Sequence, residues 1–341
     1  MKLQAALENA WYKKNSWVWV LAPIALLFSF VSFTRRGLFK LGILRSKKPP
    51  VPIIVVGNIS VGGNGKTPVV IAIAEFLNQQ GHKVGVLSRG YKGTHQRFPH
   101  FVQTNDLPSS VGDEPFLLFK RLNCEVVIDP IRVRGAQALY DRHCTVVICD
   151  DGLQHYALKR DIELVVMDSR QLGNGYLLPM GPLRERAWRL KTITMLICNG
   201  DFKYEGQAAN QVNMELLPIE YVNLQDPSQR LSASQFAMRF ASVCAVCAIG
   251  NPQRFYDTIS EQGIGISERK SFPDHHRFES GDLPPKPLIM TEKDAVKCTQ
   301  FAHPDWWYVK IAANLPEVFF DNIKVQIEQT NITESERSCG V

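Results

Sequence analysis

The segment from Val51 to Ala72 constrains the fold of this chain more than any other. Its sequence is VPIIVVGNISVGGNGKTPVVIA, in which a β-branched run at residues 53–56 leads into a glycine-rich loop and then an apolar, helix-compatible stretch. The loop ends in Gly65-Lys66-Thr67. Strand, glycine-rich loop and helix in this order form a unit that binds the phosphates of a nucleotide. The segment therefore predicts an α/β protein with a parallel sheet.

The residue types in this loop suit phosphate binding. Glycines let backbone N–H groups turn toward an anion, Lys66 adds a positive charge, and the Thr67 hydroxyl can ligate magnesium. Ser60 stands where the pattern G-x-x-x-x-G-K-[ST] has its first glycine, so the turn into the loop must differ. A glycine-rich turn can also serve packing alone, but its context favours nucleotide binding. The predicted nucleotide-binding residues are Ser60, Val61, Gly62, Gly63, Asn64, Gly65, Lys66 and Thr67.

Length and composition predict a globular protein of more than one domain. The chain has 341 residues, of which 45% are hydrophobic and 21% charged, so large-scale disorder is excluded. The net charge of +6 is modest. Eight basic residues of the chain flank one apolar segment. Nucleic acid binding would need such a basic patch without the apolar segment. These residues are Lys13, Lys14, Arg35, Arg36, Lys40, Arg45, Lys47 and Lys48.

The eight cysteines favour a reducing compartment over a disulfide framework. Cys149, Cys198, Cys244 and Cys247 lie in apolar, strand-like runs, where cysteine behaves as a small buried hydrophobe. Cys244 and Cys247 form a C-x-x-C, but no second Cys or His pair follows at zinc spacing. We interpret this pair as part of a buried strand.

Residues 16–34 contain no charged side chain and approach the roughly 20 apolar residues that a membrane-spanning helix needs. Residues typical of membrane interfaces lie at its two ends, Trp17 and Trp19 at one and Arg35 and Arg36 at the other. Pro23 predicts a kink. The alternatives are a helix in one leaflet, a buried helix of a soluble protein, and a signal peptide, which would need a small-residue cleavage site. We interpret residues 1–48 as a membrane anchor with a cytoplasmic body behind it.

Several strands are predicted to end in polar residues at one edge of the sheet. Residues 83–88 form a second strand that runs into the basic loop Arg89–Gly93. Residues 124–129, 145–150 and 163–168 are apolar runs, each of which ends in aspartate. Asp150 and Asp151 suit a Walker B position, where carboxylates handle magnesium, with a capped turn as the alternative. Open parallel sheets bind ligands at this edge.

The remaining segments predict a second domain and further candidate residues. Asp113, before an apolar helical pattern, is either a helix N-cap or a catalytic carboxylate. Residues 200–230 are polar and less regular, and the Thr291–Asp294 segment favours a helix cap over a nucleotide contact. We predict a P-loop NTPase-like domain, a smaller α/β domain and a disordered tail, with the respective bounds 49–191, 192–330 and 331–341. The second domain has strands at 192–199, 243–249 and 288–291, with the polar loop 272–278 between the last two.

Seven motifs in chain order, together with the apolar N-terminal segment, resemble the tetraacyldisaccharide 4'-kinase family, the lipid A 4'-kinases of Gram-negative bacteria. The motifs are GNISVGGNGKTP, SRGY, GDEP, DDGLQH, GPLRE, FPDHHRF and TEKDAVK. The resemblance covers nearly the whole chain. The family's loop usually has the form S-V-G-G-x-G-K-T, so Ser60 agrees with it.

The resemblance implies a kinase that moves the γ-phosphoryl group of ATP to the 4'-hydroxyl of a tetraacylated disaccharide 1-phosphate in lipid A biosynthesis. The implied cofactors are ATP and Mg²⁺. Lys66 and Thr67 would hold phosphates and magnesium, and Asp150 and Asp151 would serve the metal. Asp113 would accept the hydroxyl proton, and His275 would orient it. The candidate substrate residues are Tyr91, Arg184 and Glu185.

The implied location is the inner membrane, with the catalytic body on the cytoplasmic face beside an anionic lipid surface. No nucleic acid and no obligate protein partner is expected. One alternative is a membrane-bound nucleotide switch that hydrolyses ATP or GTP for targeting or assembly, although it leaves the GDEP and DHH motifs unexplained. The other is a soluble small-molecule kinase whose apolar N-terminus is a buried helix.

Overall fold

A single sheet of 13 strands runs through the residues that this computed structural model describes, which are 2–13, 15–208 and 210–339. The first seven strands are β1 Ile53–Gly57, β2 Val84–Ser88, β3 His100–Phe101, β4 Glu125–Ile128, β5 Val146–Asp150, β6 Ile162–Asp168 and β7 Met195–Asn199. The others are β8 Asn210–Asn223, β9 Arg230–Leu231, β10 Val243–Cys247, β11 Ile266–Ser271, β12 Leu288–Thr291 and β13 Trp306–Asn314. Their order is β11-β10-β12-β13-β8-β7-β6-β1-β5-β2-β4-β3, and β9 pairs with β8.

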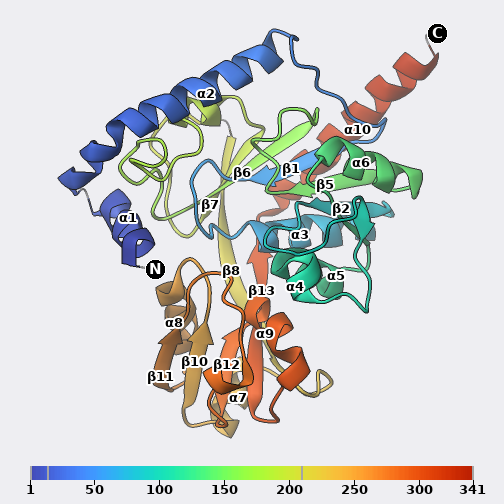
Figure 1. Cartoon of the computed structure of the whole chain (residues 1–341). Coiled ribbons are helices and arrows are strands. Elements are labelled where there is room, and N and C mark those ends of the chain that lie inside the picture. Colours follow the sequence, from blue (N-terminus) through green and yellow to red (C-terminus); the bar gives the residue numbers. More distant parts are fainter. Residues whose placement is uncertain (1, 14, 209, 340–341) are drawn as a thin grey trace.

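Helices cover both faces of this sheet (Figure 1). The α-helices are α1 Lys2–Tyr12, α2 Ala22–Lys40, α3 Lys66–Gln79, α4 Pro108–Val111, α5 Asp113–Arg121, α6 Arg132–Asp141, α7 Ala233–Arg239, α8 Pro252–Glu261, α9 Glu292–Cys298 and α10 Glu317–Cys339. Short 3-10 helices occupy Ser16–Leu21, Ala187–Lys191, Ser280–Asp282 and Thr299–Phe301.

The first half of the molecule, strands β1 to β7, is the predicted P-loop sheet. β1 lies between β5 and β6 and pairs in parallel with both. Both β1 and β5 are buried at every position, which explains their continuous apolar sequences. α3, α5 and α10 contribute to the core on one face, and α6 contributes to the core on the other. This arrangement confirms the α/β fold with a parallel sheet.

β8 joins this half to the second half, which comprises strands β9 to β13 (Figure 1). Its first part pairs in parallel with β7, and its last part pairs antiparallel with β13. β7 is also hydrogen-bonded to β6. The sheet therefore continues across the domain boundary predicted at residue 192, and the division into domains stays a prediction. Residues 210–223, expected to be irregular, instead form the longest strand because hydrogen bonds on both sides hold them.

The apolar N-terminal segment lies outside the core. Ser16–Lys40 is long and apolar enough to cross a membrane, and only 11% of its apolar window is buried. The side chains of Leu26, Phe30 and Phe33 are exposed, so the interpretation as a buried helix is wrong. Pro23 stands in the first turn of α2, directly after a 3-10 turn, so it does not kink a continuous α-helix.

The expected tail at residues 331–341 differs from the structure, because α10 continues to Cys339. Residues 331–339 contain no glycine or proline that would end a helix, and residues 340–341 lie outside the described residues. Phe319, Ile323 and Ile327 are fully or almost fully buried in the core of the first half. Their spacing of four residues places them on one face of α10, and their burial stabilises the helix that extends beyond them.

Candidate active site

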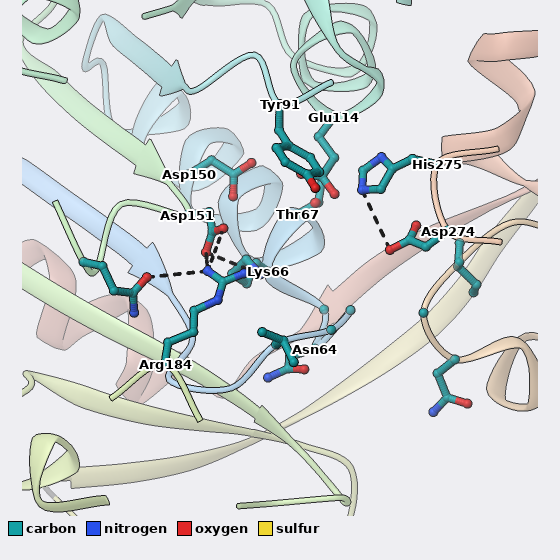
Figure 2. Close-up of a pocket in the computed structure, with 18 of the residues that line it drawn as sticks. Asn64, Lys66, Thr67, Tyr91, Glu114, Asp150, Asp151, Arg184, Asp274 and His275 are labelled. Atoms are coloured by element: carbon teal, nitrogen blue, oxygen red, sulfur yellow. Dashed lines mark hydrogen bonds and ion pairs between the residues drawn. The ribbon is translucent and has the colours of Figure 1, made fainter. Parts of the chain in front are cut away.

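A cleft of about 2010 Å³ lies where the two halves meet, at the carboxyl ends of β1 and β5. Figure 2 shows part of its lining. The loop between β1 and α3 forms one wall, and the segment after β11 contributes Asp274 and His275 to another. The cleft thus occupies the edge of a parallel sheet at which such folds bind ligands.

The buried side chain of Asn64 fixes the glycine-rich loop through hydrogen bonds. Asn64 is 2% exposed, and its Nδ2 donates to Ser60 Oγ at 3.1 Å and to the Val166 carbonyl at 3.3 Å. Arg170 Nη2 donates to Asn64 Oδ1 at 3.4 Å. The hydroxyl of Ser60 therefore has a structural use that a glycine could not supply. Gly65 has a φ of 92°, which permits the turn into α3 at Lys66.

Lys66 and Arg184 surround Asp151. Lys66 Nζ lies 3.6 Å from Asp151 Oδ1, and Arg184 Nη1 donates to Asp151 Oδ2 at 3.1 Å (Figure 2). Burial opposes ionisation of Asp151, but these two cations outweigh it and hold its pKa below the ordinary value. Asp151 is therefore an anion at neutral pH that orients both cations at the phosphate loop.

Asp150, at the end of β5, lacks such partners. Asp150 is only 2% exposed, and its Oδ1 has no hydrogen-bond partner among the described residues. Burial, with the nearby charge of Glu114, raises the pKa of Asp150 to about 7. A bound cation would compensate this buried oxygen. Asp150, Asp151 and Thr67 supply hard oxygen donors, which fit Mg²⁺.

No group of three or more His, Cys, Asp or Glu side chains forms a metal cage within the described ranges. Mg²⁺ does not need one, because it commonly binds through one or two carboxylates together with substrate phosphates. The residues at the phosphate loop therefore fit a metal that arrives with a nucleotide.

Asp113 and His275 meet although 162 residues separate them in the chain. His275 Nδ1 lies 3.2 Å from Asp113 Oδ2, and Lys297 Nζ lies 3.8 Å from the same oxygen. Burial opposes ionisation of Asp113, but the His275 hydrogen bond and Lys297 outweigh it and lower its pKa. Gly112, not Asp113, holds the cap position of α5, so the interpretation of Asp113 as N-cap is wrong. The Asp113 side chain is free to contact His275.

Lys293 ties this pair to the first half and was not selected from the sequence. Its Nζ donates to Glu114 Oε1 at 2.9 Å and to Asp274 Oδ1 at 3.3 Å. It also lies 3.4 Å from His275 Nε2. Burial opposes the charge on Lys293, but Glu114 and Asp274 raise its pKa above the ordinary value. Lys293 lies in the Thr291–Asp294 segment and in the motif TEKDAVK, but the sequence favoured a helix cap there over a nucleotide contact.

The other candidates take different places. Tyr91 is exposed, and its ring centroid lies 5.5 Å from that of His275. Glu185 is buried and accepts a hydrogen bond from Tyr156, with Arg189 Nε at 3.2 Å. Ser60 and Asp113 are not among the lining residues, whereas all the other candidates line the cleft. Thr291 caps α9 by accepting from the Asp294 N–H at 3.2 Å, which confirms the interpretation as a cap.

Comparison with known proteins identifies the family of this chain. Residues 17–328 match the family described as Tetraacyldisaccharide-1-P 4'-kinase. The relative of that name from Pseudoalteromonas atlantica is 48% identical over 307 residues, which cover 89% of this chain and 98% of the relative. The one from Haemophilus influenzae is 45% identical over 313 residues, 90% of this chain and 92% of the relative.

A solved structure is also similar. It is LpxK from Aquifex aeolicus in complex with ATP, with a TM-score of 0.79 and 26% sequence identity. The similarity covers 91% of this chain and 99% of that chain. Sequence and fold lead to the same conclusion: the chain belongs to the tetraacyldisaccharide-1-phosphate 4'-kinase family.

Proposed function

We propose how the cleft of this ATP-dependent lipid A 4'-kinase transfers a phosphoryl group to the 4'-hydroxyl of tetraacyldisaccharide 1-phosphate. The observation that carries the proposal is the approach of Asp113 and His275, 3.2 Å apart, at the cleft that the phosphate loop lines. Phosphoryl transfer needs the donor phosphates, a base for the hydroxyl and compensation of charge. The walls of the cleft hold the phosphate loop, Asp150, Asp151 and His275, and His275 contacts Asp113, which lies outside the lining.

ATP binds with its phosphates against the loop at residues 60–67. The backbone N–H groups of the loop and Lys66 attract the phosphate oxygens. The Aquifex aeolicus relative was solved in complex with ATP, which supports this placement. Asp150 and Thr67 would hold Mg²⁺, with Asp151 nearby, and the metal would supply neutralisation of phosphate charge. The unpaired Oδ1 of Asp150 supports this assignment.

Asp113 and His275 act as the base for the sugar hydroxyl. Asp113 is ionised at neutral pH, as the direction of its pKa shift requires, and its carboxylate has a free lone pair that can accept the proton. His275 lines the cleft, and its contact with Asp113 Oδ2 orients both groups. Tyr91, Arg184 and Glu185 line the same space and are assigned to the substrate side.

The exposed apolar face of α2 supports association with the inner membrane. Leu26, Phe30, Phe33 and Arg36 of α2 also line the cleft. An acylated disaccharide 1-phosphate has both apolar chains and an anionic head, so it matches this combination of apolar and basic residues. We place the catalytic body on the cytoplasmic face, where ATP is available.

The test is transfer of label from radiolabelled ATP to the disaccharide 1-phosphate lipid in mixed micelles containing Mg²⁺. Wild type should form labelled lipid, and Asp113→Ala should reduce kcat by about a hundredfold to ten-thousandfold because a positioned base is lost. Lys66→Ala should fail through weak phosphate binding. Asp141→Ala, on the exposed surface of α6, is the matched control and should retain activity.

Free labelled phosphate without labelled lipid would reject the phosphotransfer and favour a membrane-bound nucleotide switch. An Asp113→Ala variant as active as the Asp141→Ala control would reject Asp113 as the base while leaving the kinase activity in place.

A further inference from the structure

A buried asparagine links the phosphate loop to the second half. Asn199 ends β7 and is 3% exposed. Its Nδ2 donates to the backbone carbonyl of Asn64 at 2.8 Å. Its Oδ1 accepts a hydrogen bond from Arg254 Nη2. Since Oδ1 and Nδ2 have opposite hydrogen-bonding roles, the two contacts together determine which way the Asn199 amide faces.

Arg254 comes from α8 in the second half, in the first turn of the helix. Its backbone N–H is capped by Asn251 Oδ1 at 3.4 Å, and its side chain lines the cleft. The loop before α8 also packs directly on the phosphate loop. A Cβ atom placed on Gly250 would lie 3.0 Å from the Gly63 nitrogen, so the two backbones touch where only glycine leaves room.

The carbonyl that Asn199 holds belongs to the peptide bond between Asn64 and Gly65. A trans peptide is planar, and its C=O and N–H point in opposite directions. With the carbonyl fixed toward Asn199, the N–H of Gly65 faces the other way. Gly65 lines the cleft, and a Cβ on this residue would lie only 2.4 Å from Asn199 Nδ2.

We propose that Arg254 is a positioning residue for the nucleotide, acting through Asn199 on the peptide between Asn64 and Gly65. Without Arg254, no charged donor selects which way the side-chain amide of Asn199 faces. If this amide turned over, its Oδ1 would face the Asn64 carbonyl in place of its Nδ2. The loop N–H would then lose its fixed direction. The inference deepens the proposed function, since it rests on the loop binding the phosphates of ATP.

The test measures ATP binding by calorimetry, without lipid, and then steady-state kinetics with ATP and lipid. A hydrogen bond to a charged group predicts that Arg254→Ala weakens ATP binding by about tenfold to a hundredfold. Arg254→Lys, which keeps a cation and a donor, should recover part of the loss. The KM for lipid should stay within about twofold of wild type. Gln253→Ala, exposed on the same helix, is the matched control and should behave as wild type.

A double-mutant cycle separates this chain of contacts from a local effect of Arg254. Once Asn199→Ala has removed the link, adding Arg254→Ala should change ATP affinity by less than about twofold, because contacting residues do not act additively. Independent, additive losses would overturn the proposal.

Two further results would overturn it. One is unchanged ATP affinity in Arg254→Ala. The other is a lower melting temperature of Arg254→Ala without nucleotide, together with equal increases in the KM for ATP and the KM for lipid. That pattern would show that Arg254 has a structural role only. Failure of wild type to label the lipid would reject the phosphotransfer alone, since the ATP titration judges Arg254 independently.

Discussion

Arg121 and Glu292 form a buried ion pair between the two halves, and replacing Arg121 with methionine should destabilise the protein. Arg121 ends α5, and its Nη1 donates to Glu292 Oε2, at the start of α9, at 2.7 Å. The two side chains are 6% and 13% exposed. Arg121 Nη2 also donates to the Ile311 carbonyl at 3.2 Å. The variant would leave a carboxylate and a carbonyl in the interface without these donors.

The expected loss is about 3 to 5 kcal/mol, because removing one partner leaves the other charge buried and uncompensated. Burial already raises the pKa of Glu292 above its ordinary value, despite the opposing charge of Arg121. The folded state therefore binds the Glu292 proton more tightly than the unfolded state. It follows that acid favours the folded variant, so its deficit should be larger at pH 8 than at pH 6.

Urea unfolding at both pH values measures this effect in wild type, Arg121→Met, Glu292→Leu and the double variant. The double variant should regain most of the stability, because apolar residues of similar volume often replace a buried ion pair at no cost. Lys120→Met, exposed on the same helix, is the control for the substitution itself. Additive losses in the double variant, or a deficit independent of pH, would refute the reasoning.

Three other predictions concern His155, Gly65 and α2. Burial and the charge of Arg132 lower the pKa of His155 to about 4 from 6.5, so the folded state loses stability as pH falls through this interval. His155→Gln should remove that acid sensitivity in urea titrations at pH 7 and 5, and an unchanged pH dependence would contradict the prediction. Gly65→Ala should abolish ATP binding in calorimetry with the circular dichroism spectrum retained, because its Cβ would lie 2.4 Å from Asn199 Nδ2. Gly281→Ala serves as control, because a Cβ at that position meets nothing within 4 Å. Leu26→Glu with Phe33→Glu should release the protein from sedimenting vesicles without lowering its melting temperature, since both side chains are exposed, and continued sedimentation would count against membrane binding through α2.

Local patterns predicted the strands that are buried on both faces. β1, β5 and β6 lie within a residue or two of their predicted bounds, because continuous β-branched runs between polar ends leave little choice of structure. The same patterns did not predict β8. Its sequence, NQVNMELLPIEYVN, is polar and contains Pro218, and its positions are mostly exposed or only partly buried. Hydrogen bonds to β7 and β13 hold it in place, and those neighbours cannot be deduced from its own composition.

The candidate active-site residues divide in the same way. The phosphate loop and the Asp150-Asp151 pair follow from sequence because strand, turn and chemistry are contiguous there. The contact of Asp113 with His275 bridges 162 residues, so residue spacing alone could not predict it, and the family resemblance supplied the pairing. Lys293 was missed because its role depends on Glu114, which another part of the chain brings within 2.9 Å. Tertiary contacts of this kind carry no local signal.

The packing of α10 has a consequence for how the protein is made. The strands of the first half all lie before residue 200, yet Phe319, Ile323 and Ile327 of α10 complete its core together with Val70 and Ile73 of α3. Domains usually fold as units as they leave the ribosome, N-terminal first. The core of the first half therefore stays incomplete until residues 319–327 have been synthesised, so nascent chains expose its apolar surface up to that point. Chains that stop before Glu317 lack side chains that support α3, the helix after the glycine-rich loop, and we expect proteases to cleave such fragments more readily than the full chain.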